Sequence, residues 1–94
     1  MINVIITDEI VEISGHAGHA EAGQDIVCAA VSALGDTAAS LLWDEPEARD
    51  GYLLLRYRQS DRDELAYINY LVSGLGLIMD TYPSRINIED YRAH

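Results

Sequence analysis

The sequence contains no lysine and no phenylalanine, and only one cysteine among its 94 residues. A single cysteine cannot form a disulfide within the chain, which is typical of proteins in a reducing compartment. Charged residues interrupt the apolar stretches within about a dozen residues, too short for a bilayer span. Residues 1–8 carry neither a basic lead nor a small-residue cleavage site, so no secretory signal is indicated. These absences predict a cytoplasmic protein that does not enter a membrane.

Basic residues are scarce, with six arginines against sixteen Asp and Glu residues and a formal net charge of −10. Nucleic-acid binding depends on Lys and Arg side chains that replace phosphate counterions, so this balance argues against a nucleic-acid partner. An acidic surface instead attracts basic partners and steers their approach. The alternative is that the charge only keeps the protein soluble.

The length and the apolar content predict one folded domain over residues 1–94. Hydrophobic residues make up 49% of the chain, which is too many for a disordered segment. A chain of this length buries only part of the surface that it exposes when unfolded, so association into a dimer would add stability.

Apolar and β-branched residues, mostly in alternation with polar ones, predict four strands. These strands span residues 2–7, 10–13, 52–57 and 86–91. Asp8 and Glu9 are expected to form a tight turn between the first two strands. Residues 44–51 are polar and predict a turn before the third strand.

Apolar residues at steps of three and four predict two helices. The first begins after Asp25, a strong N-cap residue, and runs to Trp43, with Gly35 as a candidate break. The second begins at Ser60, which is followed three residues later by an acid as in a capping box, and ends before Pro83. The order ββαβαβ predicts an α+β fold in which two helices pack on a mostly antiparallel sheet.

Cys28 is the candidate nucleophile. With Asp25 as the cap, Cys28 lies in the first turn of a helix, where free N–H groups carry a partial positive charge and stabilise a thiolate. His16 lies twelve residues earlier, in a segment rich in Gly and Ala that is long enough to fold back toward Cys28. A cysteine and a histidine suffice for attack on an amide, because the histidine takes the thiol proton and later gives it to the leaving amine.

Two other interpretations of these residues stay open. A lone cysteine on an apolar helix is most often a small buried side chain without a chemical role. His16, His19 and Cys28 could also bind zinc, with Glu21 or Asp25 as a fourth ligand. The zinc pattern lacks the second Cys or third His of ordinary zinc motifs.

The segment from Gly15 to Leu34 resembles the signature of the ribosomal-processing cysteine protease family, Prp. The resemblance rests on Gly15-His16-Ala17 and on the run from Gly23 to Leu34, which contains the Asp-Ile-Val-Cys-Ala helix start. In length, element order and acidity the resemblance extends over nearly the whole chain, and the second half agrees only in pattern.

The resemblance implies a cysteine endopeptidase that removes the N-terminal extension of large-subunit ribosomal protein number twenty-seven and so permits ribosome assembly. It also implies a homodimer that needs no metal or other cofactor, with His16 and Cys28 as the catalytic dyad. Asp25 and Ser32 match further motif positions and are expected to support the dyad. The segment expected to close over the substrate contains Gly15, Ala17, Gly18, His19 and Gly23.

Elementary chemistry suggests how these supporting residues act. Asp25 caps the helix or orients His16, and the cap is the favoured role. Ser32 lies four residues after Cys28 on the same helical face, so its hydroxyl could bond the dyad or, equally, a carbonyl of its own helix. His19 is a second candidate base, although Gly15 and Ala17 complete the family triplet around His16.

Two other classes of function stay open. One is a non-catalytic, acidic, dimeric module that binds a basic ribosomal protein without cutting it. The other is a redox or acyl-transfer enzyme that uses the thiol of Cys28. Only the protease predicts peptide cleavage that depends on both Cys28 and His16.

Overall fold

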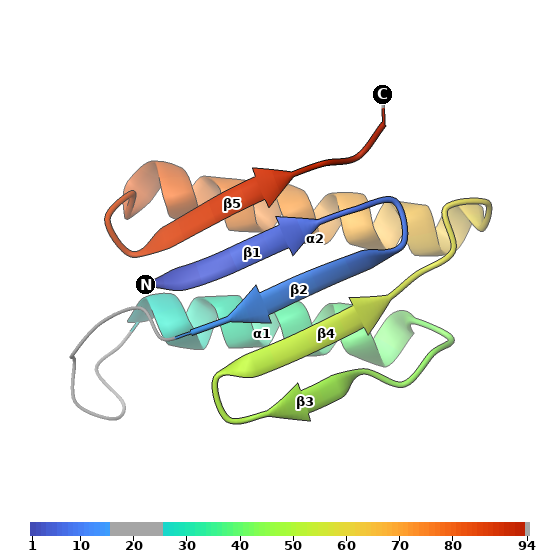
Figure 1. Cartoon of the computed structure of the whole chain (residues 1–94), viewed down its shortest axis with the longest axis horizontal. Coiled ribbons are helices and arrows are strands. Elements are labelled where there is room, and N and C mark those ends of the chain that lie inside the picture. The colour runs from blue at the N-terminus through green and yellow to red at the C-terminus, as the bar shows by residue number, and fades with distance from the viewer. Residues whose placement is uncertain (16–25, 94) are drawn as a thin grey trace.

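Two helices cover one face of a five-stranded sheet in the computed structural model, which describes residues 1–15 and 26–93 (Figure 1). The strands are β1 (Ile2–Ile6), β2 (Ile10–Ser14), β3 (Glu47–Arg49), β4 (Tyr52–Arg56) and β5 (Ile86–Asp90). The helices are α1 (Ile26–Leu41) and α2 (Arg62–Thr81). The arrangement confirms the predicted α+β class. Neither of these two helices is long and apolar enough to cross a bilayer.

The sheet is mixed, in the order β3-β4-β2-β1-β5, and only the β1–β5 pair is parallel. β1 and β2 form a hairpin with Asp8 and Glu9 at its turn, as predicted, and the N–H of Thr7 donates to the carbonyl of Ile10 at 2.9 Å. β5 returns to pair with β1, so β1 lies in the interior of the sheet. The prediction of a mostly antiparallel sheet is confirmed.

The hydrophobic core lies between the sheet and the two helices. Successive side chains of a strand point to opposite faces, so alternate strand residues reach the helices. Almost wholly buried side chains come from both layers, and they include Val4, Ile6, Val11 and Leu55 of the sheet and Ile68, Leu71 and Leu75 of α2. The α2 members follow the predicted steps of three and four residues.

The structure departs from the prediction at residues 47–49, which form β3 within the segment predicted as a turn. β3 pairs with β4 across the two-residue turn Asp50–Gly51, where Gly51 has a φ of 70°. All three β3 side chains are exposed. β3 therefore lacks the apolar alternation that indicates a strand, and the element order is ββαββαβ.

α1 runs through Gly35 without a break and ends at Leu41, two residues before the predicted end. Gly35 is buried, and a Cβ at this position would lie 2.7 Å from Cδ2 of Leu53 in β4. The glycine therefore allows the close approach of α1 to the sheet without displacing Leu53, and it does not interrupt the helix.

The N-cap of α2 is Asp61 and not the predicted Ser60. Oδ1 of Asp61 accepts hydrogen bonds from two backbone N–H groups of the first turn, at 3.0 and 3.1 Å. Glu64, in the same turn, is only 2% exposed. Its carboxylate accepts hydrogen bonds from the backbone N–H groups of Trp43 at 2.8 Å and Arg58 at 2.9 Å. One carboxylate thus joins the segments that follow α1 and β4 to the start of α2.

Candidate active site

Cys28 lies in the first turn of α1 and lines a cavity of about 420 Å³. Its side chain is half-buried and packs against the edge of the hydrophobic core. The wholly buried residues of α1 are other ones, among them Val27 and Val31. The exposure toward a cavity weighs against the interpretation of Cys28 as an inert core side chain.

On the α1 side, the polar side chains that line this cavity are those of Cys28, Ser32 and Asp36. Residues four apart lie on the same face of a helix, so the three side chains form a row along α1. Ser32 is exposed, one turn beyond Cys28. Hydroxyl groups that donate to carbonyls of the same helix occur farther along α1, at Thr37 and Ser40. Ser32 is therefore placed to meet a molecule in the cavity.

The facing wall of the cavity is the β3–β4 hairpin, from Ala48 to Leu53. The tip of this hairpin lies at the same end of the sheet as the start of α1 (Figure 1). The N–H of Gly15 donates to the carbonyl of Gly51 at 2.8 Å, so the hairpin tip is joined to the end of β2. The other lining residues, Ile2, Ile13 and Val31, are apolar. The cavity therefore combines an apolar lining with a polar rim.

Arg49 and Tyr52 form a stacked pair at the hairpin tip. The two residues are opposite each other in the β3–β4 register, and the Arg49 guanidinium lies 3.9 Å from the centre of the Tyr52 ring. The Tyr52 hydroxyl donates to Oε2 of Glu12 at 2.9 Å, and this hydrogen bond raises the pKa of Tyr52 above its usual range. Tyr52 therefore stays neutral at physiological pH and presents its ring to Arg49.

Gly15 is the last residue of the first described range, residues 1–15, and its backbone conformation requires glycine. Its φ is 94°, in the region that L side chains rarely adopt. A Cβ at this position would also collide with the carbonyl oxygen of Met1. The geometry at Gly15 therefore fixes the direction in which the chain leaves β2 beside the cavity.

Three of the predicted site residues meet at this cavity, namely Gly15, Cys28 and Ser32. The other predicted positions lie outside the described residues; they are His16, Ala17, Gly18, His19, Gly23 and Asp25. Most ligands of the alternative zinc site fall in the same undescribed segment. Within residues 1–15 and 26–93 no three His, Cys, Asp or Glu side chains form a metal-binding group.

The hairpin wall has no counterpart among the site residues predicted from the sequence. Arg49, Asp50 and Gly51 were all assigned to a polar turn, and Asp36 was assigned to the helix without a role. One signal was available, because Asp-Gly between two strands is typical of a two-residue hairpin turn. That signal could have placed a second wall beside the helix that carries Cys28.

Comparisons with known proteins agree on one family. The model of the family described as cysteine protease Prp matches residues 1–87. The chain is 32% identical over 99 residues to the ribosomal processing cysteine protease Prp of Mycoplasma pneumoniae, a match that covers 98% of this chain and 97% of that protein.

Solved structures show the same similarity in three dimensions. One is the essential ribosomal processing protease Prp from S. aureus in complex with a covalently linked product peptide, with a TM-score of 0.84 and 26% identity over 96% of this chain and 99% of that chain. Another is the S. aureus protease in complex with a substrate peptide, with a TM-score of 0.79 and the same identity and coverage.

Proposed function

The chain belongs to the cysteine protease Prp family, and from this membership we propose that Cys28 is the nucleophile and His16 the general base. The observation that carries the proposal is the position of Cys28, half-buried in the first turn of α1 at the wall of a cavity of about 420 Å³. His16 directly follows Gly15, which lines the same cavity. A peptide bound in the cavity would lie against the thiol.

In the proposed reaction, His16 takes the proton of the Cys28 thiol and the sulfur attacks the carbonyl carbon of the scissile bond. The tetrahedral intermediate collapses to a thioester when His16 gives the proton to the leaving amine. Water then attacks the thioester with His16 again as base, which releases the carboxylate product and restores the thiol. The free N–H groups at the start of α1 favour the thiolate, because they carry a partial positive charge.

The proposed substrate is the N-terminal extension of large-subunit ribosomal protein number twenty-seven. Two observations support this choice. The Mycoplasma pneumoniae and S. aureus relatives are ribosomal processing proteases, and the net charge of −10 favours the approach of a basic protein. Removal of the extension would aid ribosome assembly in the cytoplasm, which is the proposed location.

The two proposed supporting residues, Asp25 and Ser32, have different roles. Asp25 is proposed to cap α1 and so to hold the turn that carries Cys28. Ser32, exposed one turn further along the cavity wall, is proposed to bond the substrate or the dyad. The enzyme is proposed to work as a homodimer without a metal or other cofactor. Sedimentation of the purified chain would show the dimer as twice the mass of 10.4 kDa.

The decisive experiment is cleavage of a synthetic peptide that contains the extension and its junction with the ribosomal protein. The parent protein is compared with Cys28→Ala and His16→Ala, and with His19→Ala as the matched control in the same segment. We expect both dyad variants to lose at least about a thousandfold in kcat/KM. His19→Ala is expected to keep the parent value, since His19 lies outside the family triplet.

The two alternative functions give different results. A binding module would leave the peptide intact at every length tested. Its Cys28→Ala variant would bind the peptide as tightly as the parent protein does. A redox or acyl-transfer thiol would be alkylated at Cys28 at neutral pH without any peptide cleavage. Full activity of His16→Ala together with loss of activity in His19→Ala would move the role of general base to His19.

A further inference from the structure

The outer edge of β3 has backbone groups that no described strand uses. β3 is the first strand in the sheet order, so β4 is its only strand neighbour among the described residues. Arg49 and Tyr52 flank a two-residue turn, and a pair in that position exchanges both of its backbone hydrogen bonds. Hydrogen-bonded and non-hydrogen-bonded pairs alternate along an antiparallel ladder, so Ala48 and Leu53 form a non-hydrogen-bonded pair.

Backbone bonds on the other side of β4 confirm this assignment. The N–H of Tyr57 donates to Glu9 at 3.0 Å, and Gly51 accepts from Gly15 at 2.8 Å, so the odd-numbered residues of this segment bond toward β2. Leu53 therefore faces β2, and the N–H and C=O of Ala48 point away from β4 into the space beyond the sheet.

The side chain of Ala48 lies on the face of the sheet that α1 covers. Opposite residues of a strand pair lie on the same face of a sheet, so Ala48 shares the face of Leu53, whose Cδ2 approaches Gly35 of α1. Ala48 consequently lines the same cavity as Cys28 and Ser32. A chain that pairs with Ala48 would direct the side chain opposite it toward this cavity, because paired residues share a face.

We propose that the substrate binds as an added strand on the free edge of β3, with its backbone paired to the N–H and C=O of Ala48. The proposal deepens the proposed function, on which it rests, by assigning the recognition of the substrate main chain. One substrate side chain would enter the cavity, while the peptide runs beside the α1 row of Cys28, Ser32 and Asp36. Main-chain pairing provides affinity in this mode, and the cavity provides selectivity.

A substrate peptide fits this edge better than a second copy of the chain. Only Ala48 of the three β3 residues presents both groups outward, and so short an edge offers little pairing for a stable contact between two copies. The free groups adjoin the Cys28 cavity, as substrate binding requires. Two carboxylates at the rim, Asp36 and Asp50, are exposed and suit a basic peptide.

The test measures binding to the inactive Cys28→Ala protein, so that its result does not depend on cleavage. Extension peptides that carry one backbone N-methyl group at successive positions are titrated by fluorescence anisotropy. N-methylation removes a donor and blocks the approach of a strand. We expect methylation at a single position to raise Kd about tenfold, which is the effect of one lost hydrogen bond. Methylation at either neighbouring position should leave Kd at the parent value.

A protein variant provides the complementary measurement. Ala48→Pro removes an N–H that takes no part in the β3–β4 ladder, so the fold should tolerate it at this edge. Ala48→Ser keeps the N–H at nearly the same volume and is the matched control. We expect Ala48→Pro to raise the Kd of the parent peptide about tenfold relative to Ala48→Ser, which keeps the N–H, at similar melting temperatures.

Several outcomes would overturn strand addition. They are equal Kd values for all methylated peptides, losses at adjacent positions, or no measurable binding. Should Ala48→Pro fail to fold, the methyl scan alone decides. A change in sedimenting mass with an unchanged Kd for Ala48→Pro would assign the edge to a second copy. Absence of cleavage by the parent, together with a methylation effect at a single position, would refute the protease activity and leave the binding mode intact.

Discussion

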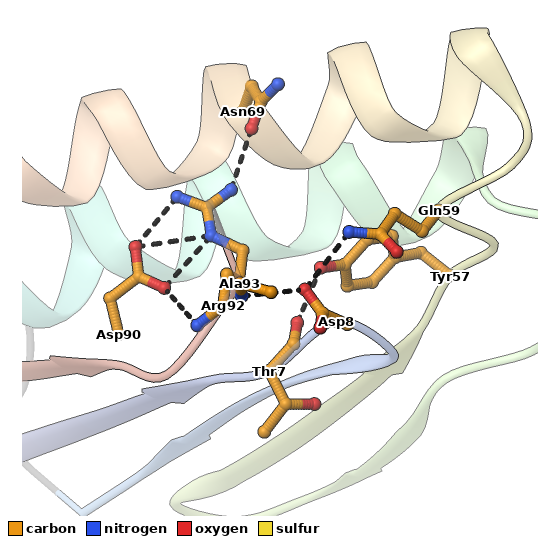
Figure 2. Close-up of polar contacts among 8 residues, drawn as sticks. All are labelled: Thr7, Asp8, Tyr57, Gln59, Asn69, Asp90, Arg92 and Ala93. Atoms are coloured by element: carbon orange, nitrogen blue, oxygen red, sulfur yellow. Dashed lines mark hydrogen bonds and ion pairs between the residues drawn. The ribbon is translucent and has the colours of Figure 1, made fainter.

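The two ends of the sheet are held together in different ways. At the end where α1 begins, the Cys28 cavity lies between α1 and the hairpin tip, and a backbone hydrogen bond from Gly15 to Gly51 joins the segments. At the opposite end, where α1 finishes and α2 begins, polar side chains bond segments that are far apart in the sequence (Figure 2). The proposed catalytic cavity thus lies where such cross-links are fewer among the described residues.

The polar end is organised around Asp8 and Arg92. Oδ1 of Asp8 accepts hydrogen bonds from Nε2 of Gln59 at 3.1 Å and from the N–H of Ala93 at 3.2 Å, so the β1–β2 turn is tied to two other segments (Figure 2). Arg92 bonds Asp90 at 2.8 Å, in an ion pair whose side chains are 16% and 30% exposed. Together, the carboxylates of Asp8 and Glu64 bond the segments that follow α1, β4 and β5 at this end.

If Cys28 is the nucleophile, as proposed, the polar cross-links and the reactive thiol lie at opposite ends of the same sheet. Substrate-binding segments tend to be drawn from the less stable parts of a protein, because they have to change shape or accept a ligand. Because carboxylates join distant segments at the other end, the fold depends less on contacts at the cavity end, where segments can adjust to a ligand. Substitutions at the polar end should therefore lower stability, with little effect on the activity of the folded protein.

The largest stability effect is expected for Glu64→Ala. The substitution leaves the N–H groups of Trp43 and Arg58 without their acceptor in a buried setting, which costs about 2–4 kcal/mol of the free energy of unfolding. Glu64→Gln retains one carbonyl oxygen and should lose about half of that amount. Urea denaturation measures both values, and kcat/KM of the folded protein should stay at the parent level. A large loss of activity at full folding would break the separation of the two ends.

Gly15→Ala is expected to have the next largest effect, and to alter both properties. The φ of 94° and the contact with the carbonyl of Met1 leave no room for a side chain, so we expect a loss of about 2 kcal/mol. Because Gly15 directly precedes His16, kcat/KM should fall as well. Denaturation and peptide cleavage are measured on the same samples. Parent-like values of both quantities would show that the cavity end is less constrained than its backbone indicates.

The contribution of Tyr57 to the polar end can be measured from the pH dependence of the free energy of unfolding. Its hydroxyl donates to the carbonyl of Thr7, and burial raises the pKa of Tyr57 above its usual range. The unfolded chain therefore ionises first, so the stabilisation is complete below pH of about 10 and is lost as pH rises through the folded pKa. Tyr57→Phe should cost about 1 kcal/mol at neutral pH. Its stability should converge with that of the parent above pH of about 10, and parallel curves would contradict the assignment.

The smallest effects are expected from two helical glycines that form a matched pair. Alanine is favoured over glycine inside a helix by about 1 kcal/mol. A Cβ at Gly76 of α2 meets no atom within 4 Å, so Gly76→Ala should stabilise the protein by about that amount. A Cβ at Gly35 of α1 would lie 2.7 Å from Leu53, so Gly35→Ala should gain nothing or lose stability. Equal gains in melting temperature would show that α1 and β4 can shift to accommodate a methyl group at Gly35.

The sequence predicted those elements that carry a strong apolar period. The α2 row of Ile68, Leu71 and Leu75 and the alternation in β1 each bury one face, and a buried face leaves a readable pattern. β3 was missed because its Glu-Ala-Arg side chains are all exposed, and its pairing depends on the Asp50–Gly51 turn. The parallel pairing of β1 with β5 likewise has no local signal, since it joins residues from the two ends of the chain.

The candidate site was predicted on its α1 side and at Gly15, but not along the β3–β4 hairpin. Cys28 and Ser32 could be paired from their spacing, because four residues make one helical face. The facing wall could not be found in the same way, since Ala48 and Asp50 enter the cavity through tertiary contact between α1 and the hairpin. Gly35 shows the same limit. A glycine in a helix suggests a break, whereas here the neighbouring Leu53 leaves no space for a side chain.

The parallel pairing of Ile2 with Ile86 has a consequence for the order in which the molecule can assemble. β1 precedes every other described element and β5 follows them, so a growing chain presents β1 with one edge unpaired until β5 has been made. Val4 and Ile6, which end with no exposed surface, have their complete surroundings only when the final strand arrives. Contacts of such long sequence separation form slowly. The sheet is therefore complete only after β5 has been made, and a chain cut short before β5 would carry an open, aggregation-prone edge.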